Sequence, residues 1–162
     1  MALKKLIEIG YGQLELNLVS FPRTGNIVAQ YKAGESFTKD NSPLENGMLL
    51  KVDGKNRCVE KAAPTPGAIY ALNYSTEHMY DERTYALRDF KLNPTDDFYP
   101  RLGYLSVGDK FTTNCVCAEV GEEEVTVAEA WSTAKTNFEK NEIYGVACEL
   151  GYIQLVDAIP AD

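Results

Sequence analysis

The sequence predicts an all-β fold, a single antiparallel β-barrel or sandwich-like domain with an N-terminal arm and long loops. Short segments in which apolar and polar residues alternate recur along the chain, and turns containing Gly or Pro separate them at near-regular intervals. The pattern shows no alternation of strands with long helices of the kind that builds parallel sheets. Ten Tyr and six Phe shift the composition toward strand-forming residues. The chain has 162 residues, which is enough for one domain with its own core.

Charge and hydropathy narrow the classes of partner. Acidic residues outnumber basic ones by 24 to 16, and the formal net charge of −8 repels phosphate backbones. We therefore expect no nucleic acid as the main ligand. The sequence has no apolar run of about twenty residues, and its first residues show no small-residue cleavage site. We expect no membrane span, no secretion by a signal peptide, and folding in a cytoplasm.

Residues 1–12 are predicted to form an N-terminal arm, and residues 13–162 the β-rich body. The arm is apolar at several positions and ends in a flexible stretch with glycines on both sides of Tyr11. It fits either a short amphipathic helix packed on its own domain or a tether laid on a neighbour. Because the following segment suggests no strand partner for it, we expect the arm to contact another protein chain. The candidate partner-binding residues are Leu3, Leu6, Ile7, Ile9 and Tyr11.

Two hairpins are predicted in the first part of the body. Residues 13–31 alternate cleanly at their start, and a turn at residues 22–26 precedes a returning strand. The residues on the apolar face of its first strand are Leu14, Leu16 and Leu18. Residues 47–61 contain Asp53-Gly54, which is the strongest hairpin turn signal in the chain.

The remainder of the body is predicted segment by segment. Residues 68–75 form a strand covered on both faces, and residues 76–100 form a long connection. The two halves of residues 101–118 alternate around a Gly-Asp turn, and they are predicted to be a central strand pair. Residues 128–138 are interpreted as a loop, and residues 143–156 as one or two strands. The residues predicted to lie in the core are Leu105, Val107, Phe111, Cys115, Val116, Val146, Ile153 and Leu155.

Histidine and cysteine give weak indications of a metal site. His78 is the only histidine, and it lies among carboxylates in a loop-like stretch without a second histidine ligand, so we interpret it as a surface residue. The cysteines lie in apolar, strand-like segments without a CxxC spacing. This context favours buried thiols that are reduced and free of metal. The four cysteines are Cys58, Cys115, Cys117 and Cys148.

Two acidic clusters are the remaining candidates for chemistry. Asp96 and Asp97 lie in the long connection, and residues 122–124 are three consecutive glutamates. Neither cluster has the ligand spacing of a calcium loop, so both are interpreted as solvated turns. The sequence has no nucleophile elbow, no phosphate-binding loop and no His-Glu-x-x-His motif. We therefore expect no cofactor, no bound metal and no enzymatic activity.

Three segments carry a resemblance to a known family. They are residues 47–54 (GMLLKVDG), 101–114 (RLGYLSVGDKFTTN) and 144–156 (YGVACELGYIQLV). Together they resemble the small β-rich structural proteins of tailed bacteriophages, especially capsid decoration proteins. In that family a β-barrel or β-tulip body lies on the capsid lattice, often as a trimer, and a terminal arm extends along the shell.

The resemblance implies a structural virion protein on the capsid surface, made in the host cytoplasm. Its expected partners are the major capsid protein and other copies of itself, in a trimer or another homo-oligomer, and residues 1–12 would be the arm. Two other classes of function stay open. A hydrolase would use the acidic clusters as acid and base. A small-ligand-binding β-barrel would line its mouth with Tyr70, Tyr74, Tyr80 and Tyr99.

Overall fold

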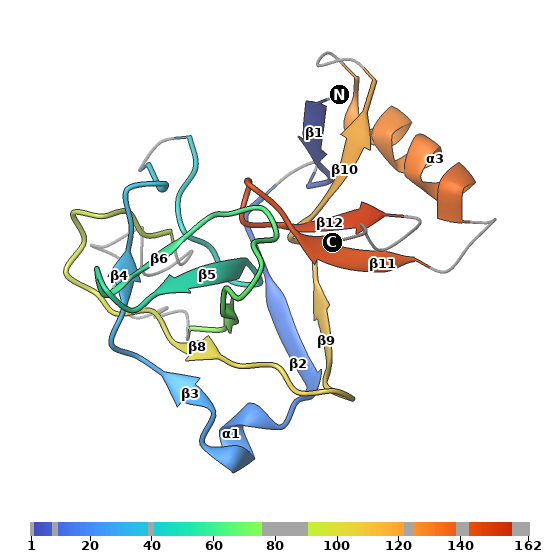
Figure 1. The fold of residues 1–162 in the computed structure, drawn as a ribbon. Coiled ribbons are helices and arrows are strands. Elements are labelled where there is room, and N and C mark those ends of the chain that lie inside the picture. Colours follow the sequence, from blue (N-terminus) through green and yellow to red (C-terminus); the bar gives the residue numbers. More distant parts are fainter. Residues whose placement is uncertain are drawn as a thin grey trace.

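The computed structural model describes residues 2–7, 10–38, 41–75, 91–121, 125–138 and 143–156. These residues are mostly β, as the sequence predicts, and their strands form three sheets (Figure 1). Among them, no helix combines the length and the apolar character needed to cross a membrane.

The four-stranded sheet joins the first and the last strands of the described chain. In spatial order its strands are β1 (Ala2–Lys5), β10 (Val116–Val120), β12 (Ile153–Val156) and β11 (Tyr144–Ala147). β1 runs antiparallel to β10, with Leu3 opposite Glu119. β10 and β12 are parallel, and β11 and β12 are antiparallel. Residues 2–5 are therefore a paired edge strand.

The six-stranded sheet is built mainly from the middle of the chain. Most of its neighbouring strands are antiparallel, but β4 and β6 are parallel. With the parallel pairing of β10 and β12, this makes the purely antiparallel prediction wrong at two places. In spatial order the strands are β3 (Ile27–Val28), β8 (Leu102–Gly103), β7 (Tyr70–Asn73), β5 (Leu49–Asp53), β6 (Cys58–Glu60) and β4 (Lys32–Ala33).

A two-stranded sheet extends from the four-stranded sheet toward the short helix α1 (Phe21–Thr24), as Figure 1 shows. It consists of β2 (Leu14–Leu18) and β9 (Lys110–Thr113), which are antiparallel. We call this pair the β2–β9 ribbon. Its register shifts between Glu15 and Leu18, which is the mark of a β-bulge or a similar irregularity.

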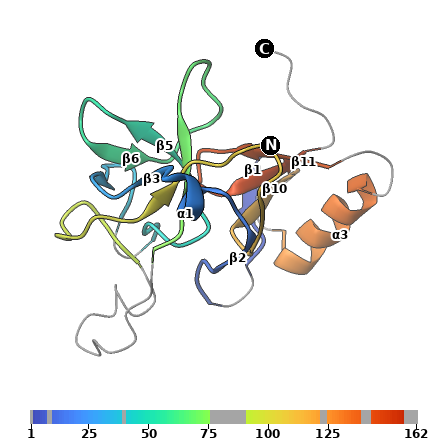
Figure 2. The same ribbon diagram turned by 90° about the horizontal axis from the view of Figure 1, so that it is seen from below.

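Buried side chains form three apolar clusters. The largest lies where segments of the six-stranded sheet meet segments of the four-stranded sheet, and it includes Leu50, Val59, Cys117 and Tyr152. The second lies between β1, β10 and the helix α3 (Val127–Phe138), and its buried members are Leu6, Ala118, Val120 and Ala130. Figures 1 and 2 show α3 beside the four-stranded sheet, at the end of the molecule away from β5 and β6. The third cluster consists of Val19, Phe21 and Leu72.

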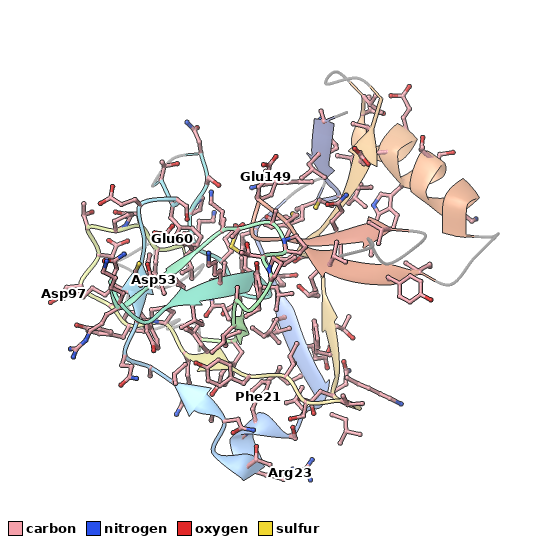
Figure 3. All side chains as sticks on the ribbon, viewed as in Figure 1. Phe21, Arg23, Asp53, Glu60, Asp97 and Glu149 are labelled. Carbon is pink, nitrogen blue, oxygen red and sulfur yellow. The ribbon has the colours of Figure 1, made fainter. Side chains whose placement is uncertain are left out.

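The predicted hairpin over residues 13–31 is wrong. β2 pairs with β9, whereas β3 pairs with β8 of the six-stranded sheet. Between them α1 makes one helical turn, with Pro22 near its start and Gly25 at φ 75° at its end. The side chain of Phe21 is fully buried, with its ring 4.7 Å from that of Tyr74 between centroids (Figure 3). Burial of this ring directs the chain away from β2 and into another sheet.

The predicted central strand pair in residues 101–118 is also wrong. β8 pairs with β7 and β3, and β9 pairs with β2, so the two strands belong to different sheets. The turn between them does form where the sequence predicts it, with Gly108 at φ 97° and a carboxylate of Asp109 accepting from the Ser106 N–H. Local sequence located the turn, but tertiary contacts determined the partners of the strands on either side.

The segment interpreted as a loop, residues 128–138, lies in α3, so this interpretation is wrong. The signal for the helix is the pair Thr126 and Glu129, which forms a capping box. The Glu129 N–H donates to Thr126 Oγ1 at 3.3 Å, and the Thr126 N–H donates to Glu129 Oε2 at 2.9 Å. These bonds satisfy donors that the first turn of a helix leaves free. Ala130 then packs beneath the helix in the second cluster.

Three strand predictions are confirmed. β5 and β6 form the hairpin in residues 47–61, and Asp53 accepts hydrogen bonds from the backbone of its own turn. β7 lies within residues 68–75, and its last three residues are fully buried. β11 and β12 pair across a turn within residues 143–156, where Gly151 adopts φ 73°.

The predicted core is confirmed in part. Cys115 is fully buried, and Phe111, Val116 and Leu155 are half-buried and pack against the clusters. Val146 and Ile153 are half-buried. The prediction is wrong for Leu105 and Val107, which are exposed. Both lie in the connection between β8 and β9, where residues 105–108 are exposed.

Candidate interaction surface

The β2–β9 ribbon and the turn before β9 carry a group of exposed apolar side chains. Eight large apolar side chains of the described residues are exposed, and half of them lie here. Leu16 is 36% exposed and Leu18 is 53% exposed, although strand alternation predicted both to face a core. We use the name ribbon surface for the four residues Leu16, Leu18, Leu105 and Val107.

The irregular register of β2 explains why its leucines differ in burial. Leu14 packs against the cluster of Val19, Phe21 and Leu72, whereas Leu16 and Leu18 are exposed to solvent. A bulge bends a strand and turns the following side chains in new directions. β2 pairs with β9 alone, and Leu16 and Leu18 remain exposed to solvent. The apolar face predicted from the sequence therefore exists, and only its first residue is packed.

A carboxylate holds the turn of the ribbon surface against the end of β2. Asp109 Oδ1 accepts from the Ser20 N–H at 2.8 Å, and Asp109 Oδ2 accepts from the Ser106 N–H at 2.9 Å. The bonds from Ser106 and then Ser20 lower the pKa of Asp109 below its usual value. The turn that presents Val107 is thus fixed by an ionised side chain at neutral pH.

The proposed partner-binding residues of the N-terminal segment have a different environment from the one expected. Leu6 is 5% exposed and belongs to the cluster under α3, while Leu3 and Ile7 pack against the largest cluster. Tyr11 is half-buried, with Lys91 Nζ 5.4 Å from its ring centroid, and Ile9 lies outside the described residues. The expectation that this segment lacks a strand partner is wrong, because β10 pairs with it.

A buried carboxylate ties the N-terminal segment to the last hairpin. Glu45 Oε2 accepts from the Tyr152 hydroxyl at 2.9 Å, and Glu45 Oε1 accepts from the Gly12 N–H at 3.2 Å. Glu45 and Tyr152 are both buried, and burial raises the pKa of Tyr152, so its hydroxyl stays a donor. Lys5 Nζ lies 4.7 Å from the centroid of the Tyr152 ring. No pattern in the sequence indicates this network, because its members are distant along the chain.

The tyrosines proposed to line a ligand pocket do not share one environment. Tyr70 donates to the Ala63 carbonyl at 2.6 Å, and Tyr74 stacks near Phe21. Tyr99 lines a groove of ≈ 710 Å³ beside β4 and β6, where Lys32 Nζ lies 5.2 Å from its ring centroid. Tyr80 lies outside the described residues. The three described tyrosines therefore do not form a common mouth.

The acidic candidates occupy separate positions. Asp96 accepts from the Asn93 N–H within a turn, and Asp97 pairs with Lys32 at 2.7 Å. His78 and residues 122–124 lie outside the described residues. Figure 3 shows Asp53, Glu60 and Asp97 on the side of the six-stranded sheet, and Glu149 apart from them. In the described ranges, no three His, Cys, Asp or Glu side chains come together as a metal site.

Two of the cysteines meet and two do not. Cys117 Sγ and Cys148 Sγ are 3.2 Å apart, although 31 positions separate them in the sequence. Cys115 is buried nearby, and burial raises its pKa to about 12. Cys58 lies on β6, and burial raises its pKa to about 11.

Comparison with protein-family models, with curated proteins and with solved structures finds no match to this chain. The grounds for a functional proposal are therefore the arrangement of its residues and the resemblance of its sequence pattern.

Proposed function

We propose that this protein is a structural virion protein that decorates and stabilises a phage capsid, and that its copies associate through the ribbon surface. The observation that carries the proposal is the exposure of Leu16, Leu18, Leu105 and Val107, which lie on β2 and in the segment before β9. The sequence resemblance to capsid decoration proteins supplies the biological setting, with the major capsid protein as the second partner.

The physical argument begins with the small size of the β2–β9 ribbon. A two-stranded sheet is only marginally stable in water unless further strands or another layer cover it. β2 has a single neighbouring strand, and four of its five residues are exposed. A second copy that applies its own ribbon would add strands and cover the apolar side chains. We therefore assign this surface to contact between copies.

The contact between two copies should be weak, which is sufficient for copies held side by side on a capsid lattice. Covering a half-exposed Leu or Val contributes about 1 kcal/mol, so the four side chains of one copy contribute only a few kcal/mol before ordering costs. A weak contact of this size becomes effective when the capsid holds neighbouring copies close together, because the effective concentration is high. We expect weak association in solution and cooperative binding on the shell.

Substitution of exposed apolar side chains by aspartate tests the proposal directly. In Leu18→Asp and Val107→Asp, a charge replaces an exposed apolar side chain, so the monomer should stay folded while association weakens. Ile69→Asp is the matched control, since Ile69 is 60% exposed and directly precedes β7 of the six-stranded sheet. Sedimentation velocity measures self-association, and co-sedimentation with undecorated capsids measures occupancy.

The proposal requires both ribbon variants to lose self-association and cooperative capsid occupancy while Ile69→Asp retains them. If the ribbon variants assemble and occupy capsids like the unmodified protein, copies do not meet at this surface. If the unmodified protein self-associates but does not bind capsids, the ribbon contact stands and the virion role is wrong.

A further inference from the structure

The contact between Cys117 and Cys148 brings together two parts of the chain that are far apart in sequence. Cys117 lies on β10 and pairs with Lys5 on one side and Gln154 on the other. Cys148 follows β11 and enters the turn to β12. Their Sγ atoms are 3.2 Å apart, and the two residues are 0% and 2% exposed. Packing in the largest cluster holds both side chains in place.

We propose that Cys117 and Cys148 are an oxidation site, at which a peroxide converts the two thiols into an intramolecular disulfide. The Sγ atoms must close from 3.2 Å to about 2.05 Å for the disulfide bond to form. This inference does not depend on the proposed function. It is compatible with reduced thiols in a cytoplasm, and it adds an oxidised state, with the disulfide formed, in an oxidising environment.

The other two cysteines are placed differently. Cys115 Sγ donates to the Asn46 carbonyl oxygen at 3.0 Å, which directs that thiol toward the loop before β5. Cys58 lies on the six-stranded sheet, 3.7 Å from Glu60 Oε1. Both thiols have raised pKa values and therefore little thiolate at neutral pH. The geometry thus selects one pair among the four cysteines.

The pair also has the acid–base properties that the reaction needs. The hydrogen bond from Cys117 lowers the pKa of Cys148 to about 7, and the same contact raises the pKa of Cys117. Of the two thiols, Cys148 loses its proton more readily, and its thiolate is the nucleophile toward peroxide. In its protonated form the Cys148 thiol donates to the carbonyl oxygen of Tyr152 at 3.2 Å, and this proton is lost when the thiolate forms.

Because both sulfur atoms are buried, the oxidant of this proposal is a small one, hydrogen peroxide. The Cys148 thiolate attacks one peroxide oxygen, the O–O bond breaks, and hydroxide leaves and takes up a proton to become water. The product is a sulfenic acid on Cys148. Cys117 then attacks this sulfur and displaces its hydroxyl group, which leaves as a second water with the proton of Cys117. Two thiols and one peroxide give one disulfide and two waters.

The crosslink would enclose the segment that contains α3. Residues 117 and 148 bracket the end of β10, the helix and β11, a loop of 31 positions. Crosslinking a loop of this length restricts the unfolded chain and raises stability when the native geometry accepts the bond. The oxidised protein should therefore melt at a higher temperature than the reduced protein, and a dithiol reductant should reverse the difference.

The test uses the full-length folded protein and hydrogen peroxide. Thiol titration in denaturant should find four free thiols before treatment and two afterward, in agreement with the four cysteines of the chain. Peptide mapping without reductant should identify one linked pair, Cys117 with Cys148. The Cys58→Ala control should form the same linked pair, and Cys148→Ala should not.

Because Cys148→Ala removes a buried side chain, peptide mapping of the unmodified protein decides the outcome even if that variant fails to fold. As a second control, oxidation in denaturant should give mixed pairings, since the selectivity comes from the folded structure. Four thiols that survive peroxide treatment, a crosslink through Cys58 or Cys115, or sulfinic acids without a crosslink would each overturn the proposal.

Discussion

β1 and β2 are the first two strands of the chain, and the structure treats their apolar residues in opposite ways. The segment of β1 was expected to reach outward, but Leu6, which follows it, is 5% exposed beneath α3. β2 was expected to bury one face, but Leu18 is 53% exposed. β1 has the neighbour β10 and a helix above it, whereas β2 has only β9. Burial in this protein therefore depends on the cover that distant segments supply.

This difference separates two roles for apolar residues near the N-terminus. Those after β1 contribute to the stability of the monomer, because water is excluded from them by β10 and α3. Leu16 and Leu18 of β2, in contrast, are exposed in the monomer. Substitutions that distinguish folding from association should therefore have opposite effects in the two strands.

The largest effect is expected at Leu6. Leu6→Ala should lower the free energy of unfolding by about 2–5 kcal/mol, because it leaves a cavity against Ala130 and Val120. Urea denaturation followed by circular dichroism measures the change. Deletion of residues 1–7 should be more damaging still, since it also removes β1 from β10. A stable fold after that deletion would show that the segment is an arm, as the sequence first indicated.

The next effect is expected at the start of α3, the helix that covers Leu6. Thr126→Ala removes the hydroxyl that accepts from the Glu129 N–H, and it should cost about 1 kcal/mol of unfolding free energy. Thr133→Ala is the control, because Thr133 lies in the same helix and is exposed. Equal effects of the two substitutions in urea denaturation would contradict the capping role.

A smaller effect is expected from acid at the turn of the ribbon. The pKa of Asp109 in the folded protein lies below the unfolded value of 3.8. Its contribution to the free energy of unfolding is therefore fully present above pH 3.8. The contribution is lost as the pH falls through the lower folded pKa. The amide resonances of Ser20 and Ser106 should therefore shift together at acidic pH in an NMR titration. Asp109→Asn should remove that shared transition, and independent titration of the two amides would contradict the proposed link.

The smallest effect on stability is expected at Leu18. Leu18→Ala removes an exposed side chain, so the unfolding free energy should change by less than about 0.5 kcal/mol. The urea concentration at the midpoint of unfolding should be measured for Leu18→Ala and for Leu6→Ala, so that the two effects on stability can be compared directly. A loss as large as that of Leu6→Ala would place Leu18 inside the monomer core and remove the basis of the ribbon surface.

The parts of the fold that local sequence predicts all depend on interactions between residues only a few positions apart in the chain. The hairpin of β5 and β6 depends on Asp53 and a turn of a few residues, and the turn at Gly108 depends on Asp109. The cap of α3 belongs to this class as well, because Thr126 and Glu129 are three positions apart, although helix propensity alone did not reveal it. The alternation of Leu14, Leu16 and Leu18 correctly indicated a strand, because side chains in a strand point to opposite faces in turn.

By itself, the sequence determined a mostly β chain, the turns at Asp53-Gly54 and Gly108-Asp109, and most of the described strands, because these features arise from neighbouring residues. Only the tertiary structure decided which strands pair, which apolar faces are covered, and which side chains meet. Glu45 and Tyr152 are 107 positions apart, and Cys117 and Cys148 are 31 positions apart. Such contacts depend on how whole sheets pack together, and alternation shows which side chains share a face of a strand but not which element covers that face.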